Sequence, residues 1–211
     1  MDIHQDHPDL AELAREGRVV AYFGYGSLVN KRTLRTKFLG IRRASLVGWR
    51  RLWLPRIANA DMALLSVRPD ETGELQGVVV YDLADHLPAV DEREAGYARR
   101  VVELDRLTIE RAPVKDVPLY VYEALRDDET AADTGAAILQ SYLDAVMQGF
   151  LTLYGEPGVE RFVEETEGFE TRLLTDRGAA RYPRAVDLTA EEAGLFDRLV
   201  SRRGAAFVAD L

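Results

Sequence analysis

The 211-residue chain is long enough for one domain with a sizeable core, and its 47% hydrophobic and 30% charged residues are typical of a globular protein. Lys and Arg number 27 against 36 Asp and Glu, and the net charge of -9 argues against nucleic acid or an anionic membrane as the main partner. The absence of cysteine excludes disulfide scaffolds, thiolate metal sites and cysteine nucleophiles. The sequence shows no signal peptide and no apolar run of ~20 residues, so we expect a cytoplasmic protein without a membrane span.

The first 125 residues contain mainly strand-like segments, which are rich in β-branched and aromatic side chains. The predicted strands cover residues 18–23, 44–54, 62–68, 75–83, 99–110 and 119–124. Asp70-Glu71-Thr72-Gly73 has the composition of a turn, so the third and fourth of these strands are predicted to form a hairpin. Short helices are predicted at residues 9–16, 31–37 and 84–94.

The remaining residues are predicted to be helical. An acidic loop at residues 126–135 precedes helical spacing over residues 136–154, and a second helix over residues 159–167 follows a break that contains Gly and Pro. Thr189 and Glu192 have the spacing of a capping box, which predicts a last helix that extends to Arg202. Strands first and helices second predict an α+β fold, in which helices pack against a twisted or barrel-like sheet.

The segment Gly24-Tyr25-Gly26-Ser27 lies between the first predicted strand and a predicted helix. Glycines at such a position let backbone amides approach a ligand, and successive amides can converge on an anion. A dinucleotide fingerprint would need Gly or Ala in place of Val29, and neither a nucleophile elbow nor the lysine of a phosphate-binding loop is present. The alternative is a turn that uses glycine for its dihedral angles alone.

Glu94 occupies a position from which a carboxylate can face the core. The apolar residues of the predicted helix form a stripe at Leu83, Leu87 and Val90, and a further step of four residues reaches Glu94. Desolvation favours the protonated form of a carboxyl group, which suits an acid–base catalyst. The structural alternatives are a helix that ends before Glu94 or an ion pair with a nearby arginine (Arg93, Arg99 or Arg100).

The three histidines carry no specific signal. His4 and His7 lie in a polar N-terminal segment, and His86 lies on the helix face opposite Glu94, so we expect all three at the surface. Scattered histidines in a chain without cysteine do not predict a metal site.

Other polar side chains are expected mainly at the surface. The acidic run at residues 127–129 is predicted to be a surface loop. Tyr142 lies in an amphipathic helix, where a tyrosine is more often a core residue than a ligand contact. Two arginine pairs could meet a substrate carboxylate, but they are more typical of a solvated rim: Arg42 with Arg43, and Arg50 with Arg51.

Taken together, these motifs resemble the γ-glutamylcyclotransferase-like superfamily, which includes γ-glutamylcyclotransferases, γ-glutamylamine cyclotransferases and ChaC-type glutathione-degrading enzymes. YFGYGSLV at residues 22–29 is similar to the family segment in which Tyr-Gly-Ser follows the first strand. DEREAGY at residues 91–97 is similar to the family's Asp-x-Arg-Glu segment, which has a tyrosine shortly after it. Residues 141–149 look like the family helix that carries a substrate-facing tyrosine.

The resemblance implies a small mixed β-barrel with flanking helices, which is an α+β fold, in a single domain of residues 1–211. The core of this domain would span residues 19–155, and residues 156–211 would form a helical C-terminal extension. A cavity would lie between the Tyr-Gly-Ser loop and Glu94.

The reaction that the resemblance implies is intramolecular aminolysis, in which the α-amine of a γ-glutamyl compound attacks its own γ-carbonyl and releases 5-oxoproline and a free amine. Glu94 is then the implied acid–base residue. The implied substrate contacts are Phe23, Gly24, Tyr25, Gly26, Ser27, Leu28, Tyr97 and Tyr142. The implied partner is a small-molecule γ-glutamyl substrate, and the reaction implies no metal or organic cofactor.

Two other functions remain open at this point. The chain could be a non-catalytic protein that binds a small molecule or a partner on the same fold, or a lyase or hydrolase that acts on a γ-linked amide without ring closure. The particular γ-glutamyl substrate is also open, because Leu28 stands where members that act on free γ-glutamyl amino acids carry Asn. The sequence does not indicate the oligomeric state.

Overall fold

The computed structural model describes residues 5–34, 37–56, 59–125 and 129–211. The chain divides into two compact units, each built from three segments of the sequence. Unit 1 consists of Met1–Tyr25, Arg35–Trp49 and Pro69–Leu125, and unit 2 consists of Gly26–Leu34, Arg50–Arg68 and Arg126–Leu211. The single domain with a C-terminal extension, expected from the sequence, stays a prediction.

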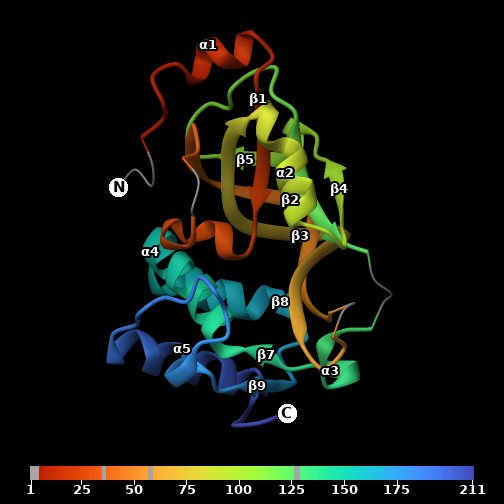
Figure 1. Cartoon of the computed structure of the whole chain (residues 1–211), viewed down its shortest axis with the longest axis vertical. Coiled ribbons are helices and arrows are strands. Elements are labelled where there is room, and N and C mark those ends of the chain that lie inside the picture. Colours follow the sequence, from red (N-terminus) through yellow and green to blue (C-terminus); the bar gives the residue numbers. More distant parts are fainter. Residues whose placement is uncertain (1–4, 35–36, 57–58, 126–128) are drawn as a thin grey trace. The chain divides into compact units, whose positions relative to one another are not determined.

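Unit 1 is organised around a mixed sheet with the strand order β4-β6-β1-β3-β2-β5 (Figure 1). Its strands are β1 (Val19–Gly24), β2 (Gly40–Pro55), β3 (Ala63–Leu83), β4 (Tyr97–Val101), β5 (Leu107–Ile109) and β6 (Leu119–Ala124), and β2 and β3 continue into unit 2. β1 pairs antiparallel with β3 and parallel with β6, and all six of its residues are buried. The apolar run that predicted this strand therefore forms the middle of the sheet, as expected for a strand covered on both faces.

The sheet is mixed but open, so the prediction of a closed β-barrel is wrong. β4 and β5 are the two ends of the strand order, and closure would require them to pair with each other. β5 has only three residues, and β4 carries the exposed side chains of Arg99 and Arg100. Short or charged strands are typical of sheet edges that do not pair further.

The predicted hairpin at Asp70-Glu71-Thr72-Gly73 is also wrong. These four residues lie inside the continuous 21-residue strand β3. A two-residue hairpin turn needs a residue with positive φ, and Gly73 is not among the glycines that have one. The Asp70 carboxylate accepts hydrogen bonds from the amide and hydroxyl of Thr72, so the polar run bonds locally without reversing the chain.

Two short helices belong to unit 1. α1 (Leu10–Arg15) confirms the helix predicted at residues 9–16. The helix predicted at residues 84–94 is a 3-10 turn, Ala84–His86, followed by α2 (Leu87–Arg93). Pro88 lies in the first turn of α2, where a backbone N–H has no partner within the helix, so proline costs no helical hydrogen bond there.

Unit 2 contains the helices of the C-terminal half and a small parallel sheet of order β10-β9-β7. Its elements are α3 (Ala131–Thr134), β7 (Ile138–Leu139), α4 (Gln140–Glu165), β8 (Thr166–Glu167), β9 (Arg172–Leu174), α5 (Ala190–Arg202) and β10 (Ala206–Val208). α3 lies within the residues predicted as an acidic loop, of which 126–128 are outside the described residues. β8 pairs with β2 through Arg51 and Leu52.

The long helix α4 contains the break that the sequence predicted. Gly155 has non-helical dihedral angles, with φ 69° and ψ -171°, so α4 consists of two helical parts. α5 begins with the predicted capping box, because the Thr189 hydroxyl accepts from the Glu192 amide while the Glu192 carboxylate accepts from the Thr189 amide. No helix in the described part of the chain is long and apolar enough to cross a membrane.

The segment Gly26–Leu34 packs against α4. It forms two 3-10 turns, Ser27–Val29 and Lys31–Thr33; the second covers only part of the helix predicted at residues 31–37, of which 35–36 are outside the described residues. Asn30 is buried and its side-chain amide donates to the Ala145 carbonyl (2.8 Å) and to Gln148 Oε1 (3.2 Å). Its Oδ1 accepts from the amide of Arg32 at 3.0 Å, so one side chain both shapes the segment and attaches it to the helix.

Replacing Gly77 by Ala should destabilise the sheet of unit 1. An added Cβ would lie 2.3 Å from the Gly24 carbonyl oxygen and 2.8 Å from the Phe23 ring, and both residues belong to the central strand β1. We expect the free energy of unfolding in urea to fall by about 1–3 kcal/mol, because backbone in a packed sheet has little room to move. Gly178→Ala is the control, since nothing lies within 4 Å of its added Cβ. An equal fall in the free energy of unfolding of both variants would contradict the packing argument.

Replacing Asn30 by Ala should loosen the segment on α4. The variant loses three hydrogen bonds, two of which join the segment to α4, so the free energy of unfolding should fall by about 1–3 kcal/mol. Hydrogen exchange should be faster at the amides of Thr33 and Leu34, which close the second 3-10 turn. Asn59→Ala is the control variant, because Asn59 is exposed and caps a surface turn. Its free energy of unfolding should lie within about 0.5 kcal/mol of the parent's.

Candidate active site

The start of the Tyr-Gly-Ser loop belongs to unit 1. Phe23 and Gly24 end the buried strand β1, where Gly24 pairs with Val78 of β3. Tyr25 follows directly; its ring is buried and its hydroxyl donates to the Tyr122 carbonyl in β6 at 2.6 Å. Three of the predicted substrate contacts therefore lie at the end of a strand whose neighbours hold it on both sides.

Tyr122 connects this strand end to helix α2. Its hydroxyl donates to Asp91 Oδ1 at 2.7 Å, and Asp91 Oδ2 accepts from Arg99 of β4 at 2.5 Å. Burial raises the pKa of the Tyr122 phenol, and the hydrogen bond to Asp91 raises it further. Helix α2 is thereby fixed over β6, the strand that also holds Tyr25.

Tyr22 of β1 is hydrogen-bonded to the neighbouring strand β3 through Asp82. Burial and the charge of Asp82, which accepts from the Tyr22 hydroxyl at 3.0 Å, raise the pKa of the Tyr22 phenol. The positive charge of Arg93 partly offsets this rise.

Glu94 caps the end of α2, and both structural alternatives that the sequence left open are present: the helix ends before Glu94, and its carboxylate pairs with an arginine. The helix ends at Arg93, and Glu94 is the capping residue, whose amide donates to the Val90 carbonyl. Its side chain is 28% exposed and Oε1 accepts from Arg93 Nε at 2.9 Å. Gly96, with φ 98°, turns the chain towards β4 and accounts for the early end of the helix.

Tyr97 is the first residue of β4 and pairs with Ala124 of β6. Its amide donates to the Glu94 carbonyl at 2.9 Å, which closes the turn between α2 and β4. The ring is half-buried. Tyr97 and Glu94 are therefore held together by the backbone of a tight turn.

The other predicted contacts belong to unit 2. Gly26 is buried, Ser27 and Leu28 are half-buried, and all three precede or form the first 3-10 turn. The amides of these three residues donate no hydrogen bond within the part of the chain that the structure describes. A Cβ added to Gly26 would lie 3.0 Å from the Tyr142 hydroxyl, so the loop and the tyrosine of α4 are neighbours.

The predicted site residues thus form two groups. Phe23, Gly24, Tyr25, Glu94 and Tyr97 lie in unit 1, and Gly26, Ser27, Leu28 and Tyr142 lie in unit 2. Sequence reasoning missed the residues that hold these groups in place. A signal existed for Asp91, which lies in the same motif as Glu94, but nothing in the local sequence distinguishes Tyr122 or Asn30.

The histidines do not join either group. His7 is exposed beside Asp9, and His86 is exposed but has its Nδ1 2.7 Å from Asp82 Oδ1. His4 is outside the described residues, as are Asp127 and Asp128 of the acidic run. Within the described residues, no cluster of His, Asp or Glu is arranged to hold a metal ion.

Two of the four arginines expected at the rim are buried. Arg42 contacts Asp6 (2.8 Å) and the Ala112 carbonyl (2.6 Å). Arg51 has no exposed surface and lies between the rings of Phe150 and Phe162, at 5.0 and 4.9 Å from their centroids. These guanidinium groups therefore support packing, and the surface prediction fits only Arg43 and Arg50.

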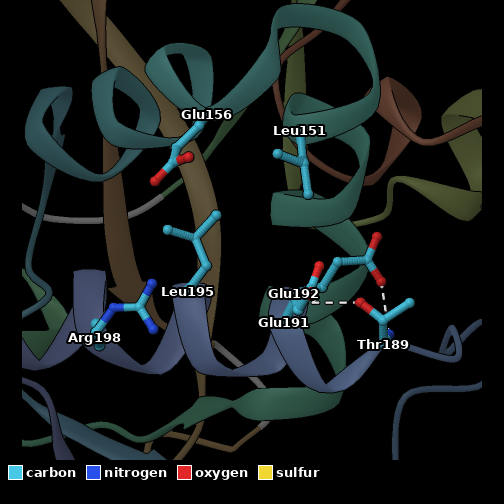
Figure 2. A pocket seen from close by; sticks show the side chains of 7 residues that line it. All are labelled: Leu151, Glu156, Thr189, Glu191, Glu192, Leu195 and Arg198. Carbon is cyan, nitrogen blue, oxygen red and sulfur yellow. Dashed lines mark hydrogen bonds between the residues drawn. The ribbon is translucent and has the colours of Figure 1, made fainter.

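A groove of about 270 Å³ lies between α4 and α5 (Figure 2). It is lined by Leu151, Glu156, Thr189, Glu191, Glu192, Leu195 and Arg198. The Glu192 carboxylate is used in the capping box with Thr189, and the other charged groups are of both signs. None of the predicted site residues lines this groove.

Comparison with known proteins places the chain in a family. A family model described as gamma-glutamyl cyclotransferase, AIG2-like, matches residues 22–138. No match was found among curated proteins.

Solved structures show a similar fold. YkqA from Bacillus subtilis is 19% identical with a TM-score of 0.54, and the match covers 72% of this chain but only 56% of YkqA. The uncharacterized protein loc79017 from Homo sapiens is 16% identical with a TM-score of 0.51, over 85% of this chain and 99% of that one. The matched residues contain both the Tyr-Gly-Ser loop and Glu94. The chain therefore belongs to the gamma-glutamyl cyclotransferase, AIG2-like family.

Proposed function

We propose that the protein converts a γ-glutamyl compound into 5-oxoproline and a free amine. Family membership supports this class of reaction. The observation that carries the proposal is the row of three consecutive amides, at Gly26, Ser27 and Leu28, that have no hydrogen-bond partner within the described residues. Free amides at the start of a helical turn are suited to bind a carboxylate or a developing oxyanion.

The chemistry needs one base and one place for negative charge. The α-nitrogen of the substrate forms a bond to the γ-carbonyl carbon, the bond from that carbon to the leaving nitrogen breaks, and one proton passes from the α-amine to the leaving amine. A free α-amine has a pKa of about 7.7–8.0, so much of it is protonated at neutral pH and it must lose a proton before it attacks. Because nucleophile and carbonyl belong to one molecule, holding the ring-closing conformation supplies much of the rate enhancement.

Glu94 is the proposed proton carrier. Within the described residues its carboxylate is hydrogen-bonded only by Arg93, and this contact uses Oε1. Oε2 is left to accept the amine proton and return it to the leaving group. The turn between α2 and β4 fixes the backbone of Glu94, and the hydrogen bond from Arg93 orients its carboxylate.

The loop and the tyrosines are the proposed substrate contacts. The amides of residues 26–28 would stabilise the charge that develops on the γ-carbonyl oxygen, while the side chains of Tyr25, Tyr97 and Tyr142 would shape the binding site. No metal or organic cofactor enters this reaction.

A non-catalytic binding protein on the same fold is the second candidate. The observation that favours it is the ion pair between Arg93 and Glu94, which gives the carboxylate a structural partner. A binding protein would use the free amides to hold an anionic ligand without turnover.

Replacing Glu94 by Gln should abolish turnover and leave the fold intact. The amide has the same shape but cannot accept the amine proton, so 5-oxoproline release should fall by about 100-fold or more. The free energy of unfolding of the variant should lie within about 0.5 kcal/mol of the parent's, because Glu94 is partly exposed and its one partner among the described residues is the adjacent Arg93. Mass spectrometry of 5-oxoproline from a panel of γ-glutamyl amines, amino acids and peptides is the measurement.

Glu92→Gln is the matched control, since Glu92 is an exposed carboxylate two residues away on the same helix. It should keep the parent's rate. An active Glu94→Gln enzyme would refute the assignment of Glu94, and a parent inactive on the whole panel would favour the binding protein.

A further inference from the structure

An aromatic cluster in unit 2 joins the Tyr-Gly-Ser loop to the C-terminal segment. The ring of Tyr142 contacts Trp53 of β2 edge-on, with 5.9 Å between centroids. The same ring contacts Tyr182, with 5.0 Å between centroids and 73° between the ring planes. Tyr142 also borders Gly26, so Tyr182 is one ring away from the loop. Tyr182 lies beyond residue 138, where the family match ends.

Two side chains of this cluster have a buried polar atom with no hydrogen-bond partner among the described residues. They are Trp53, which has no exposed surface, and Tyr182, which is 8% exposed. In each case the unpartnered atom, Nε1 or the hydroxyl oxygen, is the only polar atom of the side chain. A buried donor without a partner is destabilising and uncommon in native structures, and a missing ligand or water is a usual explanation.

The position of Tyr182 is fixed by its backbone and not by its hydroxyl. Its amide donates to the Ser141 hydroxyl oxygen at 3.2 Å, and that hydroxyl donates to Asp176 at 2.6 Å. Asp176 also accepts from the amides of Ser141 and Arg181. This network ties the segment to the start of α4, so the ring stands beside Tyr142 before any ligand arrives.

A cation borders the cluster, and two buried carboxylates of the same unit already have partners. The guanidinium of Arg184 lies 5.4 Å from the centre of the Tyr182 ring. The buried carboxylate of Asp176 is already satisfied by three hydrogen bonds, and that of Asp144 by the guanidinium of Arg177. An indole N–H can only donate and a phenol can donate, so the two unpartnered groups call for an acceptor.

We propose that Tyr182 binds substrate, by donating a hydrogen bond from its hydroxyl to a carboxylate of the γ-glutamyl compound, with Trp53 Nε1 as a second donor in the same cluster. This inference rests on the proposed function for the identity of the ligand. It gives a role in substrate binding to the C-terminal segment, which lies outside residues 22–138 matched by the family model.

Tyr182→Phe tests this role because it removes only the hydroxyl oxygen. A hydrogen bond to a charged group accounts for about 10- to 100-fold in affinity, so KM, or Kd in the binding assay below, should rise by that factor while kcat changes little. Without ligand, the variant should be as stable as the parent or more so, since it loses an unsatisfied buried group. Tyr120→Phe, in β6 of unit 1, is the matched control and should leave affinity unchanged.

Trp53 reports binding independently of turnover. The chain has two tryptophans, and Trp49→Phe leaves Trp53 as the sole indole. In that background, titration with γ-glutamyl amines and with 5-oxoproline should change the fluorescence of Trp53. Adding Tyr182→Phe should raise the ligand concentration at the midpoint of this titration by the same factor as it raises KM.

The outcomes separate the two proposals. If the parent releases 5-oxoproline but Tyr182→Phe has unchanged KM and Kd, the role of Tyr182 is refuted and the function stands. If the parent releases none but binds γ-glutamyl compounds in a Tyr182-dependent way, the role of Tyr182 stands and the function is refuted. A Tyr182→Phe protein that unfolds more easily without ligand and binds normally would show that the hydroxyl holds a structural water, which overturns the inference.

Discussion

The close approach of the segment Gly26–Leu34 to helix α4 is the constraint on which the candidate site depends. It requires a glycine in the helix, because a Cβ added to Gly149 would lie 2.7 Å from the Val29 side chain and 2.8 Å from the Asn30 amide nitrogen. Asn30 then completes the contact with hydrogen bonds to the helix. The same contact places Gly26 beside Tyr142. Asn30 and Ala145 are 115 residues apart in the sequence. The contact therefore joins two motifs that are distant along the chain.

Local sequence predicted most elements of the fold but not how the sheet ends. The strands β1 and β6 and the cap of α5 follow from side-chain types and spacing that act within a few residues. The run Asp70–Gly73 misled because its residues are compatible with a turn, whereas pairing along the whole of β3 keeps them extended. Whether β4 and β5 meet is decided by strand length and twist across the whole sheet, which no local pattern encodes.

The site was predictable where its residues lie in motifs and not where they depend on long-range contacts. Glu94 stood out by its spacing, and Gly96, two residues later, could have indicated that the helix ends early. Among the described residues the amides of residues 26–28 have no partner, and their role as donors to a ligand stays a prediction. Tyr182 could not have been found, since its neighbours Ser141 and Tyr142 are about forty residues away and the contact arises only in the folded chain.

Ring closure is the central claim, and oxygen labelling tests it most directly. The protein would be incubated with a γ-glutamyl amine in water enriched in ¹⁸O, and the products analysed by mass spectrometry. Intramolecular aminolysis incorporates no water, so the account predicts unlabelled 5-oxoproline and one equivalent of free amine. Glutamate that carries ¹⁸O in its γ-carboxylate would show hydrolysis in place of cyclisation and would contradict the account.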